Sequence, residues 1–240
     1  MVHYTGSVIA VPLANRQKYI EHARSAWPLF HKYGALRMVD CWGVDVPKGK
    51  VTDFYGAVAA TEDEAIVFSW IEWPDSAVAD AAWQSISDDP EIQNMAAMPF
   101  DGTRMIFGGF DPILHEGNDH GAAYIQGFLL AVPQANKDAY HKMAQTAWGE
   151  AFKPYGCLCL VEAWGRDVPR GKHTDFYRAA KAEDGEAPVF SWAAWPDKAT
   201  CDAASKSMEA DMQGKDFPAM PFDGMRMMWG GFEVISDLGT

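Results

Sequence analysis

Hydrophobic residues in the first half of the chain gather in short blocks, separated by stretches in which they recur every three or four positions. The blocks are bounded by Pro, Gly and Asp, which is typical of β-strands that end in turns. Four strands are predicted, at residues 7–11, 36–42, 65–73 and 104–110. The helix-spaced stretches follow the first and third of these strands. The order βαββαβ predicts an α+β fold of the ferredoxin-like type.

The first predicted helix begins at Asn15, a favourable N-cap, and ends at Gly34. Its apolar face carries Tyr19, Ala23, Ala26, Trp27 and Phe30. Pro28 lies within this stretch and is expected to kink or shorten the helix. The second helix opens at Pro74 and Asp75. Its inward residues are expected to be Val78, Ala81, Ala82 and Ile86.

The third predicted strand, AIVFSWIEW, is apolar on both faces. Ile66, Phe68 and Trp70 lie on one face, and the other face is apolar except for Ser69. The helices of a ferredoxin-like unit cover only one face of its sheet. A second apolar surface must therefore cover the other face.

The same pattern occurs twice along the chain. VPLAN at 11–15 returns as VPQAN at 132–136, WGVDVPKGKVTDFY at 42–55 as WGRDVPRGKHTDFY at 164–177, VFSWIEWPD at 67–75 as VFSWAAWPD at 189–197, and MPFDGTRMIFGGF at 98–110 as MPFDGMRMMWGGF at 220–232. The offset is 121 residues at first and 122 from Tyr33 and Tyr155 onward, which indicates a one-residue insertion. We therefore expect two units, 1–114 and 122–240, joined by a polar linker at 115–121.

The duplication supplies the missing cover for the sheet. If the two sheets pack face to face, each hides the apolar face of the other, and two half-exposed units become one closed sandwich or barrel. The chain would then be a covalently fused homodimer. Further association into a homo-oligomer is left open.

Composition narrows the choice of partners. The net charge is −13 and no run of Lys and Arg is present, which argues against nucleic acid as a partner. No run of about 18 apolar residues and no leader-like start are found, so we expect no membrane association and a cytoplasmic location. Neither the four cysteines nor the seven histidines recur at matching positions, so buried free thiols are expected, with no metal or other cofactor.

The repeated segments resemble the YbaA-like bacterial family, a domain of unknown function (number 1428) in the dimeric α/β barrel superfamily. The shared motifs are VPxAN, an acidic residue ahead of a GDDVPxGKxT loop, VFSW and MPFDGxRMxxGGF, and the acidic residue stands here as Asp40 and Glu162. The first Asp of the loop motif is replaced by Val44 and Arg166. The resemblance implies two family units packed as an intramolecular dimeric α/β barrel. It implies no particular chemistry, because a fold does not determine a function.

Arg104 and Arg226 end the MPFDG turn of each unit. One reading makes each guanidinium an anion clamp for a carboxylate ligand. The other reading has Asp101 and Asp223 cap the turn and pair with the arginine. Lys50 and Lys172 end the DVPxGK loop of each unit. The backbone amides of this loop could hold an anion, but the two lysines are explained equally well as solvated side chains of a turn.

Ser69 and Ser191 are single hydroxyls inside apolar strands. A buried hydroxyl needs a partner, which here is either a backbone carbonyl or a ligand. No histidine or carboxylate adjoins them in a nucleophile elbow, which argues against a serine hydrolase.

Aromatic residues that recur in both units could line a ligand pocket. Tyr55 and Tyr177 follow the DVPxGK loop, and Trp42 and Trp164 precede it. The tryptophans serve the core equally well. In this fold, small apolar ligands bind between the sheet and the helices.

Two functions fit these observations. In the first, the protein binds a small aromatic or carboxylate-bearing metabolite without a metal. If it is an enzyme, it also converts that metabolite. In the second, it is a non-catalytic module whose repeated residues serve folding and the fused interface. Nothing in the sequence establishes catalysis. A cavity that reaches both Ser69 and Arg104 would favour the first, whereas a filled core with Asp101 paired to Arg104 would favour the second.

Overall fold

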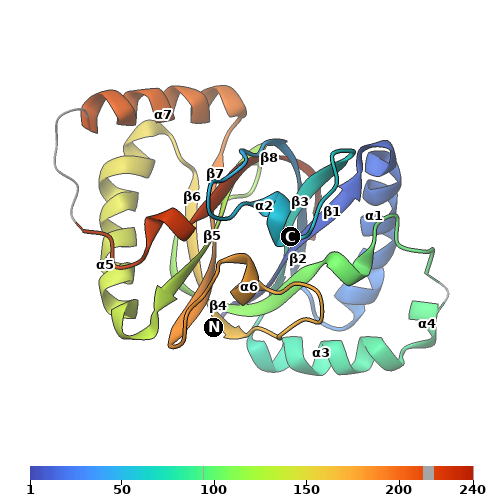
Figure 1. Cartoon of the computed structure of the whole chain (residues 1–240). Helices are drawn as coiled ribbons and strands as arrows, with labels where there is room; N and C mark the ends of the chain where they lie inside the picture. The colour runs from blue at the N-terminus through green and yellow to red at the C-terminus, as the bar shows by residue number, and fades with distance from the viewer. Residues whose placement is uncertain (94, 213–218, 240) are drawn as a thin grey trace.

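The computed structural model describes residues 1–93, 95–212 and 219–239. In this part of the chain, a closed antiparallel barrel forms the centre of the molecule and the long helices pack outside it (Figure 1). The strands are β1 (His3–Pro12), β2 (Arg37–Asp45), β3 (Glu64–Trp73), β4 (Ile106–Gly117), β5 (Tyr124–Pro133), β6 (Cys159–Asp167), β7 (Glu186–Trp195) and β8 (Met228–Leu238). The helices are α1 (Arg16–Lys32), α2 (Phe54–Ala57), α3 (Ser76–Asp88), α4 (Pro90–Gln93), α5 (Lys137–Ala147), α6 (Phe176–Ala179) and α7 (Lys198–Met212).

Each half contributes four neighbouring strands to the barrel, in the order β4-β1-β3-β2 and β6-β7-β5-β8. The two sheets join through antiparallel pairs between β2 and β8 and between β4 and β6. The predicted fold class is confirmed. The edge pairing, which the hydrophobic pattern alone does not specify, leaves no sheet edge unpaired in the barrel.

The barrel is filled by aromatic side chains from both halves. Phe68 stacks on Phe190 with ring centroids 4.2 Å apart and planes at 5°. Trp70 stacks on Trp192 at 4.4 Å. Both phenylalanines are fully buried, as expected for strands that are apolar on both faces. The lumen is therefore a packed core that holds the halves together.

The helices follow the predicted pattern with two corrections. α1 continues through Pro28 to Lys32 and is not shortened, because its buried face holds it against the sheet on both sides of the proline. In α3, Ala79 is buried in place of Ala81, which is exposed. The side chain of Asp75 caps α3 by accepting a hydrogen bond from the Val78 N–H at 2.9 Å.

Asn15 does not cap the first helix with its side chain. Its Nδ2 instead donates to the Pro99 carbonyl at 2.8 Å, and Asn136 makes the same bond to Pro221. The VPxAN motif thus ties the start of each first helix to the MPFDG turn of the same half. Asn15 stands at the N-cap position, as expected, but a partner distant in sequence takes its side chain, so that side chain makes no capping hydrogen bond.

The extra residue of the second half lies in a helical turn. α1 has a single α-helical course, whereas α5 ends at Ala147 and continues as a π-turn, η4 (Trp148–Phe152), and a 3-10 turn, η5 (Lys153–Tyr155). A π-turn accommodates one residue more than an α-helical turn of the same rise. Gly156, at φ 92°, ends the segment in the left-handed conformation.

The connection between the halves is anchored to the barrel. β4 continues to Gly117, which takes in the first residues of the segment predicted to be a linker. Asp119 is buried and accepts a hydrogen bond from Arg37 Nη1 at 2.5 Å. Trp192 Nε1 donates to the other carboxylate oxygen at 3.3 Å. The segment therefore contacts strands of both halves.

Among the residues the structure describes, no helix is both long and apolar enough to cross a membrane. All four cysteines are unpaired and buried, as expected. Burial raises the pKa of Cys157 to about 12 and that of Cys201 to about 11. Thiolate chemistry is therefore disfavoured at these positions.

Candidate functional site

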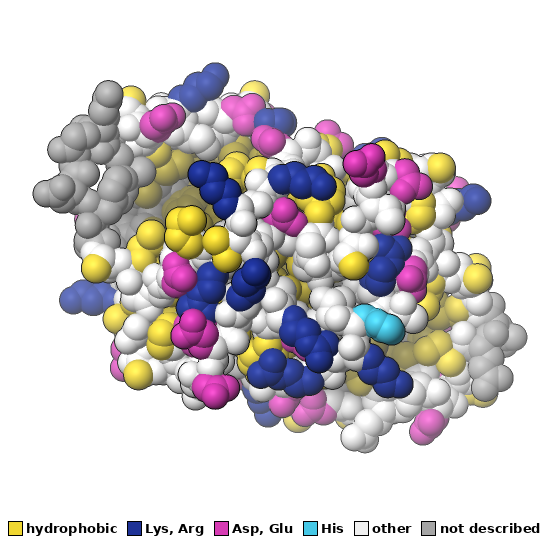
Figure 2. Space-filling model, viewed as in Figure 1, with side chains coloured by type: hydrophobic (Ala, Val, Ile, Leu, Met, Phe, Trp, Pro, Cys, Tyr) yellow, Lys and Arg dark blue, Asp and Glu magenta, His cyan; other side chains and the backbone are white. Residues whose placement is uncertain are grey.

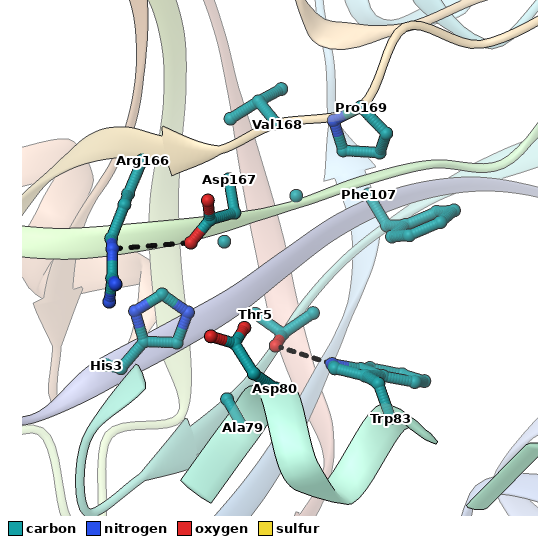
Figure 3. A pocket seen from close by; sticks show the side chains of 12 residues that line it. His3, Thr5, Ala79, Asp80, Trp83, Phe107, Arg166, Asp167, Val168 and Pro169 are labelled. Atoms are coloured by element: carbon teal, nitrogen blue, oxygen red, sulfur yellow. Dashed lines mark hydrogen bonds and ion pairs between the residues drawn. The ribbon is translucent and has the colours of Figure 1, made fainter. Parts of the chain in front are cut away.

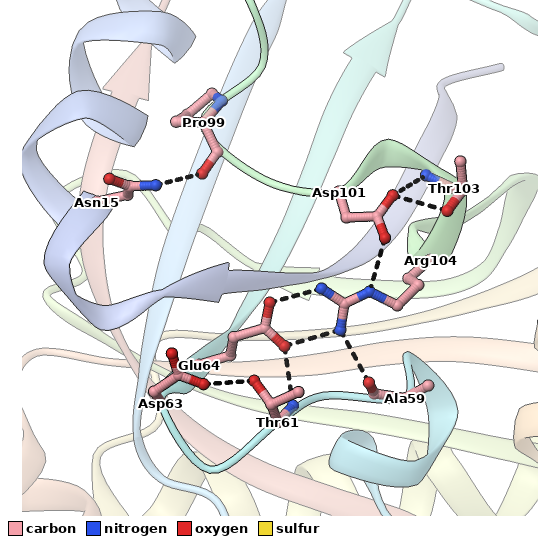
Figure 4. A network of polar contacts seen from close by, with 9 residues as sticks. All are labelled: Asn15, Ala59, Thr61, Asp63, Glu64, Pro99, Asp101, Thr103 and Arg104. Carbon is pink, nitrogen blue, oxygen red and sulfur yellow. Dashed lines mark hydrogen bonds and ion pairs between the residues drawn. The ribbon is translucent and has the colours of Figure 1, made fainter.

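The side chain of Arg104, in the MPFDG turn of the first half, is held by hydrogen bonds from all three of its guanidinium nitrogens (Figure 4). The two terminal nitrogens of Arg104 donate to the Glu64 carboxylate at 2.6 and 2.7 Å, and Nε donates to Asp101 at 3.0 Å. Nη1 also donates to the Ala59 carbonyl at 2.8 Å. Ala59 has a φ of 48°, a left-handed backbone uncommon outside glycine. The guanidinium thus clamps this turn to the start of β3.

The second half repeats this clamp with the same geometry. Arg226 donates to Glu186 at 2.7 and 2.8 Å, to Asp223 at 3.0 Å and to the Lys181 carbonyl at 2.7 Å. Lys181 is also left-handed, at φ 49°. Pairing with Arg226 lowers the pKa of Glu186. The contacts of both arginines are those expected if Asp101 and Asp223 cap the turn and pair with the arginine. The buried glutamates, Glu64 and Glu186, were not identified from the sequence.

The DVPxGK loops offer no free amide cradle at their glycines. The N–H of Gly49 donates to the Asp53 carboxylate at 2.9 Å, and the N–H of Gly171 donates to Asp175 at 3.2 Å. Lys and Arg side chains nevertheless gather near the centre of the face on which α2 and α6 lie (Figure 2). Lys50 is exposed.

The repeated tyrosines are half-buried beneath cations of the same loops. Lys48 Nζ lies 4.8 Å from the Tyr55 ring centroid, and the Arg170 guanidinium lies 3.8 Å from the Tyr177 centroid. These are cation–π contacts, which order the loops over the barrel end. Neither tyrosine lines the apolar cavity described next.

The repeated tryptophans belong to the layers between sheet and helices. Trp42 is 5 % exposed and Trp164 is 8 % exposed. Arg16 lies 5.7 Å from the Trp42 ring, and Lys137 lies 5.1 Å from that of Trp164. These contacts are those expected of tryptophans that serve the core.

Ser69 lies at the base of an apolar cavity between the sheet and α1. Its hydroxyl donates to Asp40 Oδ1 at 2.8 Å, and the Tyr19 hydroxyl donates to the same oxygen at 2.8 Å. Asp40 and Ser69 are directly opposite each other on β2 and β3. The partner of Ser69 is therefore a carboxylate, not the carbonyl or ligand that the sequence suggested.

The cavity has a volume of about 280 Å³. It reaches Ser69 and does not reach Arg104. A cavity that reached both residues would have favoured a ligand-binding role for the two together, and this cavity meets that condition only at Ser69. Apart from Asp40 and Ser69, its walls are mainly apolar or aromatic and include Ile9, Ala23, Phe30, Ile71, Phe100 and Phe107. Such a lining suits a small aromatic molecule.

Asp40 is the most unusual group in this cavity. Burial raises the pKa of its carboxyl, while the bonds from Tyr19 and Ser69 lower it. Its Oδ2 is buried and has no hydrogen-bond partner among the described residues. His22 also lines the cavity, and burial lowers its pKa. A buried carboxylate of raised pKa is equipped to accept a hydrogen bond, or a proton, from a bound molecule.

The second half carries a related but altered arrangement. Tyr140 donates to Glu162 Oε2 at 2.5 Å, and a hydrogen bond from Ser191 also favours the ionised form of Glu162. Phe128 stands where the first half has Ser7, and it lies opposite Ser191 in the β5–β7 pair. The two halves therefore differ in the groups that surround the buried carboxyl.

Asp40 belongs to one of the repeated motifs, but the sequence did not predict it to be a site residue. A signal was present, since an acidic residue recurs within an otherwise apolar strand, in RMVDCW and in CLVEAW. Within the described residues, no group of three or more His, Cys, Asp or Glu side chains is arranged to hold a metal.

The closed barrel with helices outside defines the class: two ferredoxin-like units fused into a dimeric α/β barrel. Solved structures share the fold. The chain superposes over 99 % of its length on an anthrone oxidase-like protein, with a TM-score of 0.56, 11 % identity and 92 % of that chain covered. It superposes over its full length on a "putative monooxygenase" of Fusobacterium nucleatum, with a TM-score of 0.56, 10 % identity and 94 % of that chain covered. At these identities the likeness concerns the fold alone.

The chain belongs to the DUF1428 family of proteins of unknown function, whose model matches residues 2–102 and again 123–224. It is 52 % identical over 117 residues to the uncharacterized protein YbaA of Escherichia coli strain K12. That match covers 48 % of this chain and the whole of YbaA. The predicted family and the tandem duplication are confirmed.

Proposed function

We propose that the protein binds a small, flat aromatic molecule in the cavity of the first half. The observation that carries the proposal is the buried Oδ2 of Asp40, which lacks a partner within the described part of the chain and belongs to a side chain that lines the cavity. An unsatisfied buried acceptor costs about 1–3 kcal/mol, and a ligand that donates a hydrogen bond would recover this. A phenol, enol or N–H group meets the requirement.

The same carboxylate narrows the choice of ligand. The sequence suggested either an aromatic or a carboxylate-bearing metabolite. A ligand carboxylate would face the buried acid of Asp40, and two like charges in an apolar cavity repel each other strongly. Of the two, we therefore propose the aromatic molecule with a hydrogen-bond donor. A volume near 280 Å³ is small for a ligand pocket and suits roughly one or two fused rings.

The proposal is tested with three probes that differ in one group. 2-Naphthol carries a donor, 2-methoxynaphthalene carries none, and 2-naphthoate is an anion. We expect 2-naphthol to bind about tenfold more tightly than the ether, which corresponds to about 1.4 kcal/mol, and the anion to bind most weakly. Isothermal titration calorimetry measures the affinities. Equal binding of 2-naphthol and the ether would contradict the proposal.

The variant Asp40→Asn removes the acceptor with little change of shape. The amide oxygen of the variant can still accept hydrogen bonds from Tyr19 and Ser69, but its N–H groups take the place of the acceptor in the cavity. The affinity for 2-naphthol should therefore fall about tenfold, while the affinity for the ether should stay the same. The matched control is Glu162→Gln in the second half, which should leave the affinity for 2-naphthol unchanged. An Asp40→Asn variant that binds 2-naphthol like the wild type would refute the assignment.

The alternative is a non-catalytic module whose repeated residues serve folding and the fused interface. The clamps around Arg104 and Arg226 favour it for those residues. It offers no account of the unpartnered acceptor in an apolar cavity. Under this alternative none of the probes would bind, and Asp40→Asn would change only the stability.

A further inference from the structure

A second cavity lies between the two halves and plays no part in the function proposed above (Figure 3). This inter-repeat cleft has a volume of about 480 Å³. β1, α3 and β4 of the first half form one side, and the segment Arg166–Pro169 of the second half forms the other. Thr5, Trp83 and Phe107 also line the first cavity, so the two spaces share a wall.

The duplication provides an internal template for this cleft. At the equivalent place in the other half, the ammonium of Lys198 donates to Asp202 at 2.8 and 3.0 Å and to Asp45 at 3.3 Å. It also lies 5.6 Å from the Tyr124 ring centroid. The hydroxyl of Tyr124 lies so close to Gly231 that a Cβ there would approach it to 1.7 Å. The protein's own lysine and tyrosine thus occupy that position.

The first half keeps the carboxylates of this arrangement and lacks its cation. Asp80 corresponds to Asp202 and Asp167 to Asp45, both at the offset of 122. Ser76 stands in place of Lys198, and His3 stands in place of Tyr124. Both substitutions leave a smaller side chain. The result is an open cleft around two carboxylates that, in the sister half, hold an ammonium group.

Arg166 supplies part of the missing positive charge. It replaces Val44 of the first repeat, and its Nε lies 3.3 Å from Asp167 and 3.9 Å from Asp111. Asp111 also accepts a hydrogen bond from Nδ1 of the buried His3 at 2.8 Å. Asp80 has no ion-pair partner among the described residues. The carboxylates of Asp80, Asp111 and Asp167 are therefore accompanied by one guanidinium, that of Arg166, and one imidazole, that of His3.

We propose that the inter-repeat cleft binds a primary ammonium group that bears an apolar or aromatic tail. The ammonium lies between Asp80 and Asp167, where Lys198 lies in the sister half. The tail packs on Trp83 and Phe107, whose side chains line the cleft and are 39 % and 45 % exposed. Carboxylates and aromatic faces are the groups that recognise organic cations. Trp83 is held in place by a 3.4 Å hydrogen bond from its Nε1 to Thr5.

The probe is phenethylammonium, measured by isothermal titration calorimetry at low ionic strength, with 3-phenylpropionate as the anionic counterpart. We expect one phenethylammonium to bind per chain and the anion not to bind. Asp80→Asn should weaken binding at least about fivefold, and added salt should weaken it further. The matched control, Asp202→Asn in the sister half, should leave the affinity unchanged.

Ser76→Lys gives a second, independent test. It places in the first half the lysine that occupies the sister position, so the protein's own ammonium should displace the probe and abolish its binding. Binding of phenethylammonium to Ser76→Lys or Asp80→Asn as in the wild type would overturn the proposal, as would equal binding of the anion. Asp40→Asn should not affect this probe, which separates failure of this site from failure of the aromatic cavity.

Discussion

Each half of the molecule buries one carboxyl group between its sheet and its first helix, and the two groups differ by one methylene. In the second half, burial raises the pKa of Glu162 from its ordinary value of 4.5 to about 7, although the hydrogen bond from Tyr140 opposes this. Between these two values the folded protein binds more protons than the unfolded chain. Its stability therefore falls as the pH rises from 4.5 to 7, by about 3 kcal/mol, and changes little from this source above 7.

Glu162→Gln removes this titration and retains an acceptor for Tyr140. The variant should gain stability relative to the wild type as the pH rises, by about 3 kcal/mol between pH 4.5 and pH 8. Urea unfolding at the two pH values measures the difference. Glu209→Gln, at an exposed position, is the control and should show no such trend. A gain that is the same at both pH values would contradict the assignment.

At the scale of elements, one arginine in each half joins three segments that are distant in sequence. Arg104 connects its own turn to the chain just after α2 and to the first residue of β3. The pKa of Glu64 is lowered to about 2, chiefly by the hydrogen bonds from Arg104. The contribution of this pair to stability is therefore complete above pH 4.5 and is lost as the pH falls toward 2.

Arg104→Met should destabilise the protein by about 2–3 kcal/mol at pH 7, because Glu64 is left buried and charged. This loss is smaller than for a fully buried ion pair because Arg104 is partly exposed. Arg226→Met should have a similar effect. Arg24→Met, at an exposed position, is the control. Chemical unfolding measures the change, and the loss should shrink near pH 2. A neutral effect at pH 7 would argue against the clamp.

At the scale of the whole molecule, much of the fold could be predicted, because the repeats and the two-sided apolar strand together demand that the sheets cover each other. Phe68 and Phe190 meet that expectation. Of the predicted site residues, Ser69 is the one that lines the cavity proposed to bind a ligand. Ser69 was found as a polar residue in an apolar strand, but its partner Asp40 depends on the register of β2 against β3, which local sequence patterns do not determine. The bond from Asn15 to the Pro99 carbonyl, 84 residues away, is likewise not determined by local patterns.

Residues 1–121 alone should associate as a homodimer. Without the second half, the edges of β2 and β4 are unpaired and the barrel face of Phe68 is exposed to water, and a second copy of the same segment would cover both. Light scattering should give twice the mass of the segment, with the full chain as reference. A folded monomer would contradict this expectation.

Fusion of the two units also changes what a single substitution can do. In an assembly of two identical polypeptides, every replacement appears on both sides of the twofold axis. Here Lys198 fills the position between the repeats on one side, while Ser76 stands at the matching position beside the open inter-repeat cleft. In the fused chain each side can differ from the other, so one protein presents two unlike surfaces where two identical polypeptides would present a matched pair.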